Sequence, residues 1–228
     1  MRNFHSTVLA LVCITLLALT SCNREDSDTV NQDTIWTSYD LRYDANEDKS
    51  YAKAVFRFSN ASGTRLELSD GANITFNDET VPFQTGFAFY ELDMAGLIDE
   101  GTFTYNDLEG NTFSNSINIP AISFQSTLDS IARNEAFELF WDGAALEADE
   151  LVSLSVEGGL KNDTQVFIEN DEGAESLILA TDNLMELSEG NAHFSMERIF
   201  APYIQQATSA GGALYGRHRA LDTEVYMK

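Results

Sequence analysis

Downstream of Ile35, apolar and polar residues alternate over many short runs. In residues 52–58, small and aromatic side chains occupy the even positions, and polar side chains such as Lys53 and Arg57 fall between them. A period of two over short segments is typical of half-buried antiparallel strands. The alternation recurs in residues 66–68, 74–76, 87–92, 102–105 and 116–119. This half of the chain is therefore predicted to be all-β.

Turn-forming residues separate these runs. They are Asn60 to Gly63, Asp70-Gly71, Asn77-Asp78 and Glu109 to Asn111. Such residues adopt the left-handed and Asx-type conformations that close hairpins. The spacing predicts an antiparallel β-sandwich that resembles immunoglobulin-like modules in architecture only, because the Cys and Trp hallmarks of antibody domains are absent.

A second series of alternating runs follows the bridge formed by residues 120–128. Its members are residues 137–142, 152–157, 166–168, 177–179 and 192–200. Residues 215–227 are expected to form a closing hairpin that turns near residues 220–222. Residues 184–189 are expected to form the only helical turn. We therefore predict two consecutive β-sandwich domains, residues 34–124 and 125–228.

The start of the chain has a different pattern. Arg2 precedes an almost entirely apolar run over residues 7–19, and small residues follow this run. A charged n-region, an apolar h-region and a small-residue cleavage zone are the parts of a secretory signal peptide. A membrane-spanning helix needs about 20 apolar residues, more than this run contains. Residues 1–21 are predicted to be a signal peptide that is removed.

The cleavage zone reads Leu19-Thr20-Ser21-Cys22. It resembles the lipobox of bacterial lipoproteins, in which Leu and two small residues precede the Cys. The resemblance implies cleavage before Cys22, a diacylglyceryl thioether on its thiol and acylation of its freed amine. Two or three acyl chains hold a protein stably on a bilayer. The expected partner is thus the membrane, through this lipid anchor.

The predicted tether that follows is polar and acidic. It covers residues 22–33, and within it Arg24 precedes Glu25 and Asp26. This order resembles the surface-export signal of Bacteroidota-type lipoproteins, with Arg24 where Lys is usual. A flexible solvated tether explains the same composition, and both interpretations stay open. The predicted location is the outer membrane, lipid-anchored, on its periplasmic face or at the cell surface.

Charge and cysteine content narrow the classes of function. The full chain has 13 Lys and Arg against 37 Asp and Glu; loss of Arg2 with the signal leaves 12 against 37, or −25. This charge opposes binding to nucleic acid and to anionic lipid. Cys13 is lost with the signal and Cys22 is the proposed acylation site, so the folded part is predicted to have no disulfide, catalytic thiol or thiolate metal site.

Candidate catalytic residues are few. His193 and His218 are the histidines downstream of the signal, no Gly-x-Ser-x-Gly motif accompanies either, and both are expected at the surface. Glycoside hydrolysis needs two facing carboxylates, but with 37 acidic residues an abundance of carboxylates carries no signal. We therefore expect a protein that is not an enzyme.

Two acidic loops invite comparison with calcium sites. Residues 44–48 place side-chain oxygens at alternate positions, as at the start of an EF-hand loop. However, Lys49 replaces the required Gly and Val55 the bidentate Glu. These residues are predicted to be a polar hairpin tip and residues 169–175 a charged turn, so neither metal ligands nor a cofactor are predicted.

Aromatic and basic side chains leave alternatives open. Trp141 is in phase with apolar neighbours and is expected in the core. Trp36, Tyr39 and Tyr43 could stack on sugar rings or pack at a sheet edge. Residues 217–219, the one basic cluster, are expected to form a solvated strand face.

Together these features predict a non-enzymatic, membrane-anchored surface lipoprotein with a binding, adhesion or structural role. Its partner is expected to be an unidentified surface protein or glycan. The alternative is a glycan-active or glycan-binding accessory protein of polysaccharide uptake, with calcium dependence as part of that alternative.

Overall fold

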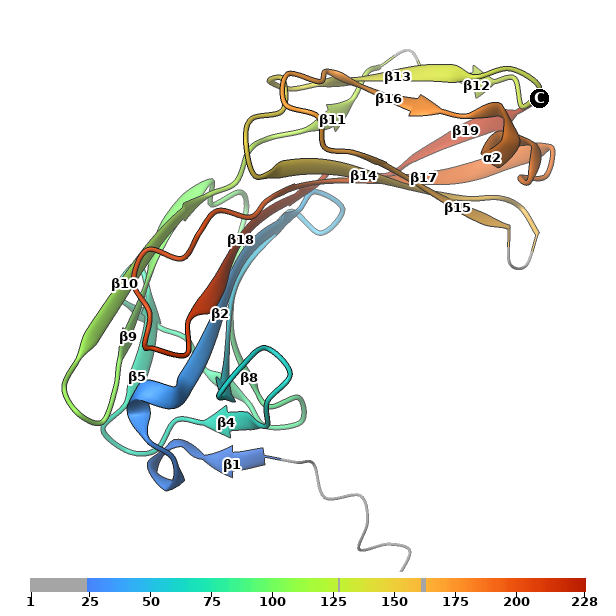
Figure 1. Ribbon diagram of the computed structural model, residues 1–228. Coiled ribbons are helices and arrows are strands. Elements are labelled where there is room, and N and C mark those ends of the chain that lie inside the picture. Colours follow the sequence, from blue (N-terminus) through green and yellow to red (C-terminus); the bar gives the residue numbers. More distant parts are fainter. Residues whose placement is uncertain (1–23, 127, 161–162) are drawn as a thin grey trace, which may run out of the picture.

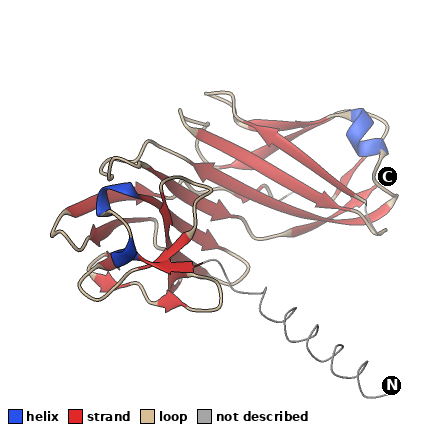
Figure 2. Cartoon of the chain, turned by 60° about the horizontal axis from the view of Figure 1, so that its bottom comes forward, coloured by secondary structure: helices blue, strands red, loops and turns tan. Residues whose placement is uncertain are grey.

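The computed structural model describes residues 24–126, 128–160 and 163–228, so the predicted signal peptide and Cys22 lie outside the described residues. The described chain is all-β, as predicted from its alternation (Figure 2). Its one α-helix, α2 (Thr181–Met185), begins three residues before the predicted helical turn. Two short 3-10 helices, η1 (Ser27–Thr29) and η2 (Gln32–Thr34), lie near the start.

One large sheet runs through the whole molecule. In spatial order its main path is β1 (Arg24–Asp26), β4 (Arg65–Glu67), β3 (Lys49–Phe58), β2 (Ile35–Asp44), β18 (Gly212–Arg219), β17 (Gly190–Phe200), β14 (Glu150–Glu157) and β15 (Thr164–Glu169). Beside this path, β8 (Phe89–Ala95) pairs with β3, β7 (Phe83–Gln84) with β8, β19 (Thr223–Met227) with β17, and β12 (Ser130–Ile131) with β19.

Two smaller sheets cover the two ends of the large sheet. The first contains β10 (Thr112–Asn118), β9 (Glu100–Asn106), β5 (Asn73–Phe76) and β6 (Glu79–Thr80), and the second contains β11 (Ser123–Phe124), β13 (Phe137–Asp142) and β16 (Ser176–Leu179). Each encloses its own hydrophobic core, so the molecule has two lobes set at an angle (Figure 1). The likeness to immunoglobulin-like modules stays a prediction.

The two lobes share β17. Its residues 190–194 pair with β19, and its residues 197–200 pair with β18. The predicted closing hairpin is therefore wrong, because β18 and β19 run in the same direction along β17 instead of pairing with each other. Residues 220–222 form a bulge opposite residues 195–196, and the Ala220 N–H donates to the Met196 carbonyl at 2.9 Å. Turn formers favour bulges as well as hairpins, which explains the error.

Strand β18 also differs from the predicted domain organisation. In sequence it falls within residues 125–228, but in space it pairs in parallel with β2, where Leu214 lies opposite Tyr39. Leu214 belongs to the core of the first lobe. The division at residue 124 stays a prediction for the rest of the chain, whereas β18 returns to the first lobe. A parallel pair needs a long crossover and leaves no local sequence signal.

The segment predicted to be a flexible tether is folded where it is described. Strand β1 pairs in parallel with β4, and the Ser69 N–H donates to the Ser27 hydroxyl at 2.9 Å. The Gln32 side chain, which is buried, donates to the Ser27 carbonyl at 2.7 Å. The tether prediction is therefore wrong for residues 24–33. Polar composition suggested solvation, but here the polar groups satisfy one another inside the protein.

A buried ion pair lies where the two cores meet. Arg198 points inward from β17 between Met196, in the second core, and Phe200, which packs on the first. Its guanidinium contacts Glu150, and the two side chains are only 1% and 6% exposed. It also donates to the carbonyls of residues 144–145 at 2.8 and 3.0 Å. Each charge thus depends on its partners for compensation.

We expect the Glu150→Ala variant to lower the free energy of unfolding by about 3–5 kcal/mol, because the Arg198 guanidinium would stay buried without its carboxylate. Chemical denaturation measures this loss. In the control variant Glu67→Ala, which removes the half-exposed ion pair with Arg24, the loss should be about 0–1 kcal/mol. Equal losses in the two variants would contradict this account.

Candidate functional site

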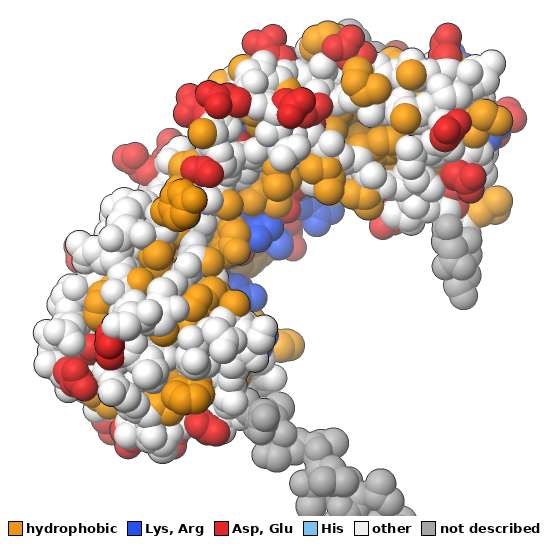
Figure 3. All heavy atoms as spheres, viewed as in Figure 1, with side chains coloured by type: hydrophobic (Ala, Val, Ile, Leu, Met, Phe, Trp, Pro, Cys, Tyr) orange, Lys and Arg blue, Asp and Glu red, His pale blue; other side chains and the backbone are white. Residues whose placement is uncertain are grey.

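The solvent-facing side of the large sheet lines the inside of the bend between the lobes, and we call it the concave face. It comprises the outward side chains of β14, β17, β18, β2 and β3. In Figure 3, Lys and Arg side chains gather inside this bend, whereas Asp and Glu side chains are spread over the outer surfaces. Cross-strand register places six cations on this face. They are Arg42, Lys49, Lys53, Arg57, Arg217 and Arg219.

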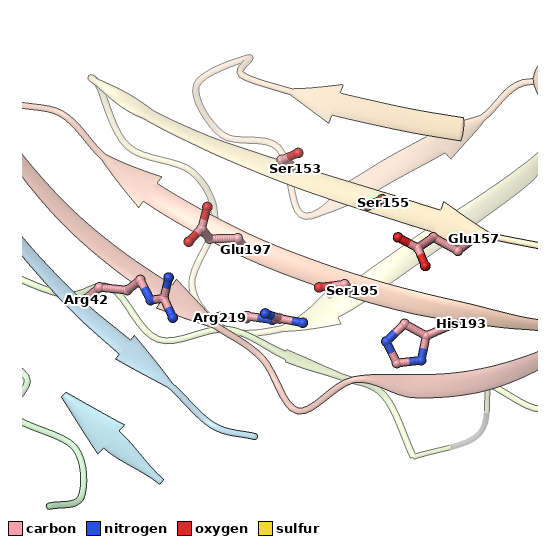
Figure 4. Close-up of a pocket in the computed structure, with 8 residues that line it drawn as sticks. All are labelled: Arg42, Ser153, Ser155, Glu157, His193, Ser195, Glu197 and Arg219. Atoms are coloured by element: carbon pink, nitrogen blue, oxygen red, sulfur yellow. The ribbon is translucent and has the colours of Figure 1, made fainter. Parts of the chain in front are cut away.

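The first hollow on the concave face lies over strands from both lobes and has a volume of about 440 Å³. Figure 4 shows its side chains standing on one side of neighbouring strands. They are Arg42, Ser153, Ser155, Glu157, His193, Ser195, Glu197 and Arg219. Its lining combines hydroxyl groups with charges of both signs, so it offers many hydrogen-bond donors and acceptors.

His193 is held between two carboxylates. Its Nε2 lies 3.1 Å from an oxygen of Asp222, and its Nδ1 lies 3.2 Å from an oxygen of Glu224. Partial burial lowers the pKa of His193, but the hydrogen bonds to Glu224 and Asp222 outweigh burial and raise it. Carboxylates only accept, so the imidazole satisfies both when it is protonated. Neither ring nitrogen is then free to take a proton from Ser195.

Ion pairs join the strands under the first hollow. Arg217 contacts Asp40 at 3.0 Å and Glu197 at 3.6 Å, and so connects β18 to β2 and to β17. Arg219 contacts Asp222 at 2.6 Å within the bulge. Burial raises the pKa of Asp40, and Arg217 only partly offsets this effect. The pairs hold the side chains of the concave face in fixed positions.

The second hollow, of about 300 Å³, lies beside the first over β2, β3 and β8. Its lining residues are Asp40, Arg42, Tyr51, Lys53 and Glu91, and Arg42 lines both hollows. The Arg42 guanidinium lies 5.4 Å from the centre of the Tyr51 ring. Asp40 Oδ1 and Arg42 Nε are buried and have no hydrogen-bond partner among the described residues.

The two acidic loops that were compared with calcium sites are turns, as predicted. Asp44 accepts hydrogen bonds from Arg42 at 2.9 Å and from the Asn46 N–H at 3.0 Å, so its oxygens are engaged within the protein. Glu169 likewise accepts from two backbone N–H groups, those of residues 170–171. The described residues include no group of three or more His, Cys, Asp or Glu that could hold a metal ion.

The basic cluster at residues 217–219 divides between two faces. Arg217 and Arg219 lie on the concave face, but His218 points the other way and is only 7% exposed. It packs edge-on against Tyr43, and burial lowers its pKa. The expectation that His218 lies at the surface is wrong, because alternate residues of a strand point to opposite faces. His193, whose side chain is 43% exposed, lies at the surface as predicted.

The structure also places the aromatic residues that the sequence singled out. Trp141 lies in the second core, as predicted, and is 4% exposed. Tyr39 is fully buried and stacks on Phe103, which resolves its role in favour of packing. Trp36 and Tyr43 are half-buried. The sequence did not single out Arg42, Asp40 or Tyr51, because they occupy the polar phase of ordinary strand alternation.

Replacement of His193 by Gln should remove a pH-dependent contribution to stability. The pKa of His193 is raised above 6.5 in the folded state, so its contribution is fully present below about pH 6.5 and disappears as pH rises through the folded pKa. Denaturation of wild type and His193→Gln should therefore show a difference in unfolding free energy at about pH 5.5 that shrinks by about pH 9.

The control is His218→Gln, for which the sign reverses. Burial lowers the pKa of His218 below 6.5, so its contribution is present above that pH and is lost as pH falls. Wild type should thus lose stability relative to His218→Gln on acidification. A difference independent of pH in either variant would contradict the assignment for that histidine.

No protein-family model matches the sequence, and no curated protein matches it significantly. In the described part of the chain, no helix has the length and apolar character needed to cross a membrane.

Proposed function

We propose that this protein is a lipid-anchored surface protein that binds a partner on its concave face and is not an enzyme. The observation that carries this proposal is the pair of adjoining hollows on the inside of the bend, which meet at Arg42. Both hollows are open and polar, and strands of both lobes line the first. Their only histidine, His193, has both ring nitrogens engaged by carboxylates, which supports binding over base catalysis.

The proposed anchor is Cys22, acylated after removal of residues 1–21. The pattern from Leu19 to Cys22 supports lipidation, and two or more acyl chains would hold the protein stably on the outer membrane. Strand β1 begins at Arg24 and is paired with β4, so only Asn23 separates the proposed anchor from folded protein. The first lobe would then lie close to the bilayer surface.

The Cys22→Ser variant should move the protein from the membrane fraction to the released fraction, because the thiol that receives the diacylglyceryl group is gone. Cell fractionation and immunoblotting of the full chain measure this change. Cys13→Ser is the matched control, since Cys13 lies in the segment predicted to be removed, and this variant should stay in the membrane fraction. Membrane retention of Cys22→Ser would contradict the anchor.

The binding role is tested with the released Cys22→Ser protein. It should capture a partner from the cell surface or from a glycan array, and the added substitution Ser155→Trp should abolish capture by filling the first hollow. Ser114→Trp, on strand β10 of the smaller sheet, is the control and should leave capture intact. Capture that survives Ser155→Trp, or no capture at all, would contradict binding on the concave face.

A further inference from the structure

We propose that the concave face binds an uncharged, hydroxyl-rich saccharide chain, with its closest contacts in the second hollow. This inference rests on the proposed binding function and names the chemical class of the ligand. The hollow is lined by Asp40, Arg42, Tyr51, Lys53 and Glu91.

Two buried polar atoms of residues that line this hollow have no hydrogen-bond partner among the described residues. Asp40 Oδ1 can only accept a hydrogen bond from a ligand, and Arg42 Nε can only donate one. Two other polar atoms of these side chains are engaged within the protein, since Asp40 Oδ2 accepts from Arg217 at 3.0 Å and Arg42 Nη2 donates to Asp44 at 2.9 Å. A hydroxyl group both donates and accepts, so sugar hydroxyls would satisfy both atoms once the side chains that cover these atoms shift to admit them.

Tyr51 lines the same hollow. Its hydroxyl donates to Glu47, and the Arg42 guanidinium lies over its ring, so two contacts fix its position. A fixed aromatic ring beside hydrogen-bonding groups gives an apolar surface with a polar edge. The C–H face and the hydroxyl groups of a sugar ring match these two surfaces.

The charged side chains that line the second hollow balance one another. In the second hollow Asp40 and Glu91 oppose Arg42 and Lys53, two charges of each sign. Neither an anion nor a cation would therefore gain from a net charge there, and the overall charge of the mature chain repels anions at long range. A neutral ligand that makes many hydrogen bonds fits this lining better than an ion does.

The two hollows together suit an extended ligand. The two hollows meet at Arg42, and the first adds the hydroxyl groups of Ser153, Ser155 and Ser195. A chain of several sugar units would contact both. The strands below are interior strands, with β2 paired to β3 and β18, so an extended peptide finds no free sheet edge to join.

The experiment combines a glycan array with isothermal titration calorimetry on the released Cys22→Ser protein. The calorimetry probes are the neutral hexasaccharides of cellulose, starch, mannan and xylan, with hexagalacturonate as the acidic comparison. We expect a neutral glycan to bind, and the added substitution Arg42→Lys to weaken that binding roughly tenfold. Lys keeps the charge that pairs with Asp44 but lacks the Nε donor.

Arg57→Lys is the matched control. Arg57 lies on β3, on the same face of the large sheet as Arg42, but it lines neither hollow. It should bind as the unmodified protein does. Tyr51→Ala should weaken binding as well, while circular dichroism verifies that each variant is folded.

Two outcomes would overturn the inference. They are the absence of binding to every neutral glycan on the array, and equal affinities for Arg42→Lys and Arg57→Lys. If a protein partner is still captured in a manner that Ser155→Trp abolishes, the proposed binding function stands and only the saccharide is excluded. If nothing binds the concave face, both proposals fail.

Discussion

The pairing of β17 along its full length is the constraint on which the architecture depends. One half of this strand pairs with β19 in the second lobe, and the other half pairs with β18 in the first. The lobes therefore share hydrogen-bonded backbone, which a flexible linker would not provide. Without this continuity, the strands that supply the concave face would not stay side by side, and its two hollows would not adjoin.

Polar interactions let the sheet continue while the hydrophobic cores stay separate. On the inner side of β17, the buried pair of Arg198 and Glu150 lies between the cores and is compensated by backbone carbonyls. On the outer side, Arg217 and Arg219 pair with carboxylates from several strands. The same two-residue period that buries one set of charges presents the other to solvent.

The sequence predicted local structure well and long-range pairing poorly. Alternation located strands such as Phe137–Asp142 because burial on one face leaves a period of two. It could not predict that Tyr39 lies opposite Leu214, because pairing between distant segments leaves no local pattern. Asp40, Arg42 and Tyr51 were missed for a related reason: a side chain that lines a hollow from the polar phase of a strand has the same sequence pattern as any solvated residue.

The short connection between the proposed anchor and β1 has a mechanical consequence. A pulling force on a ligand bound at the concave face would act on β2 and β18. Each of these strands is hydrogen-bonded to a neighbouring strand on both sides. The reaction force at the membrane would instead load three short residue pairs between β1 and β4. The hydrogen bonds between β1 and β4 would break first. The residues before β2 would then extend and lengthen the connection to the membrane, while the lobe that holds the ligand stayed folded. Local unfolding at the proposed anchor would thus absorb a pulling force before the rest of the fold is disrupted.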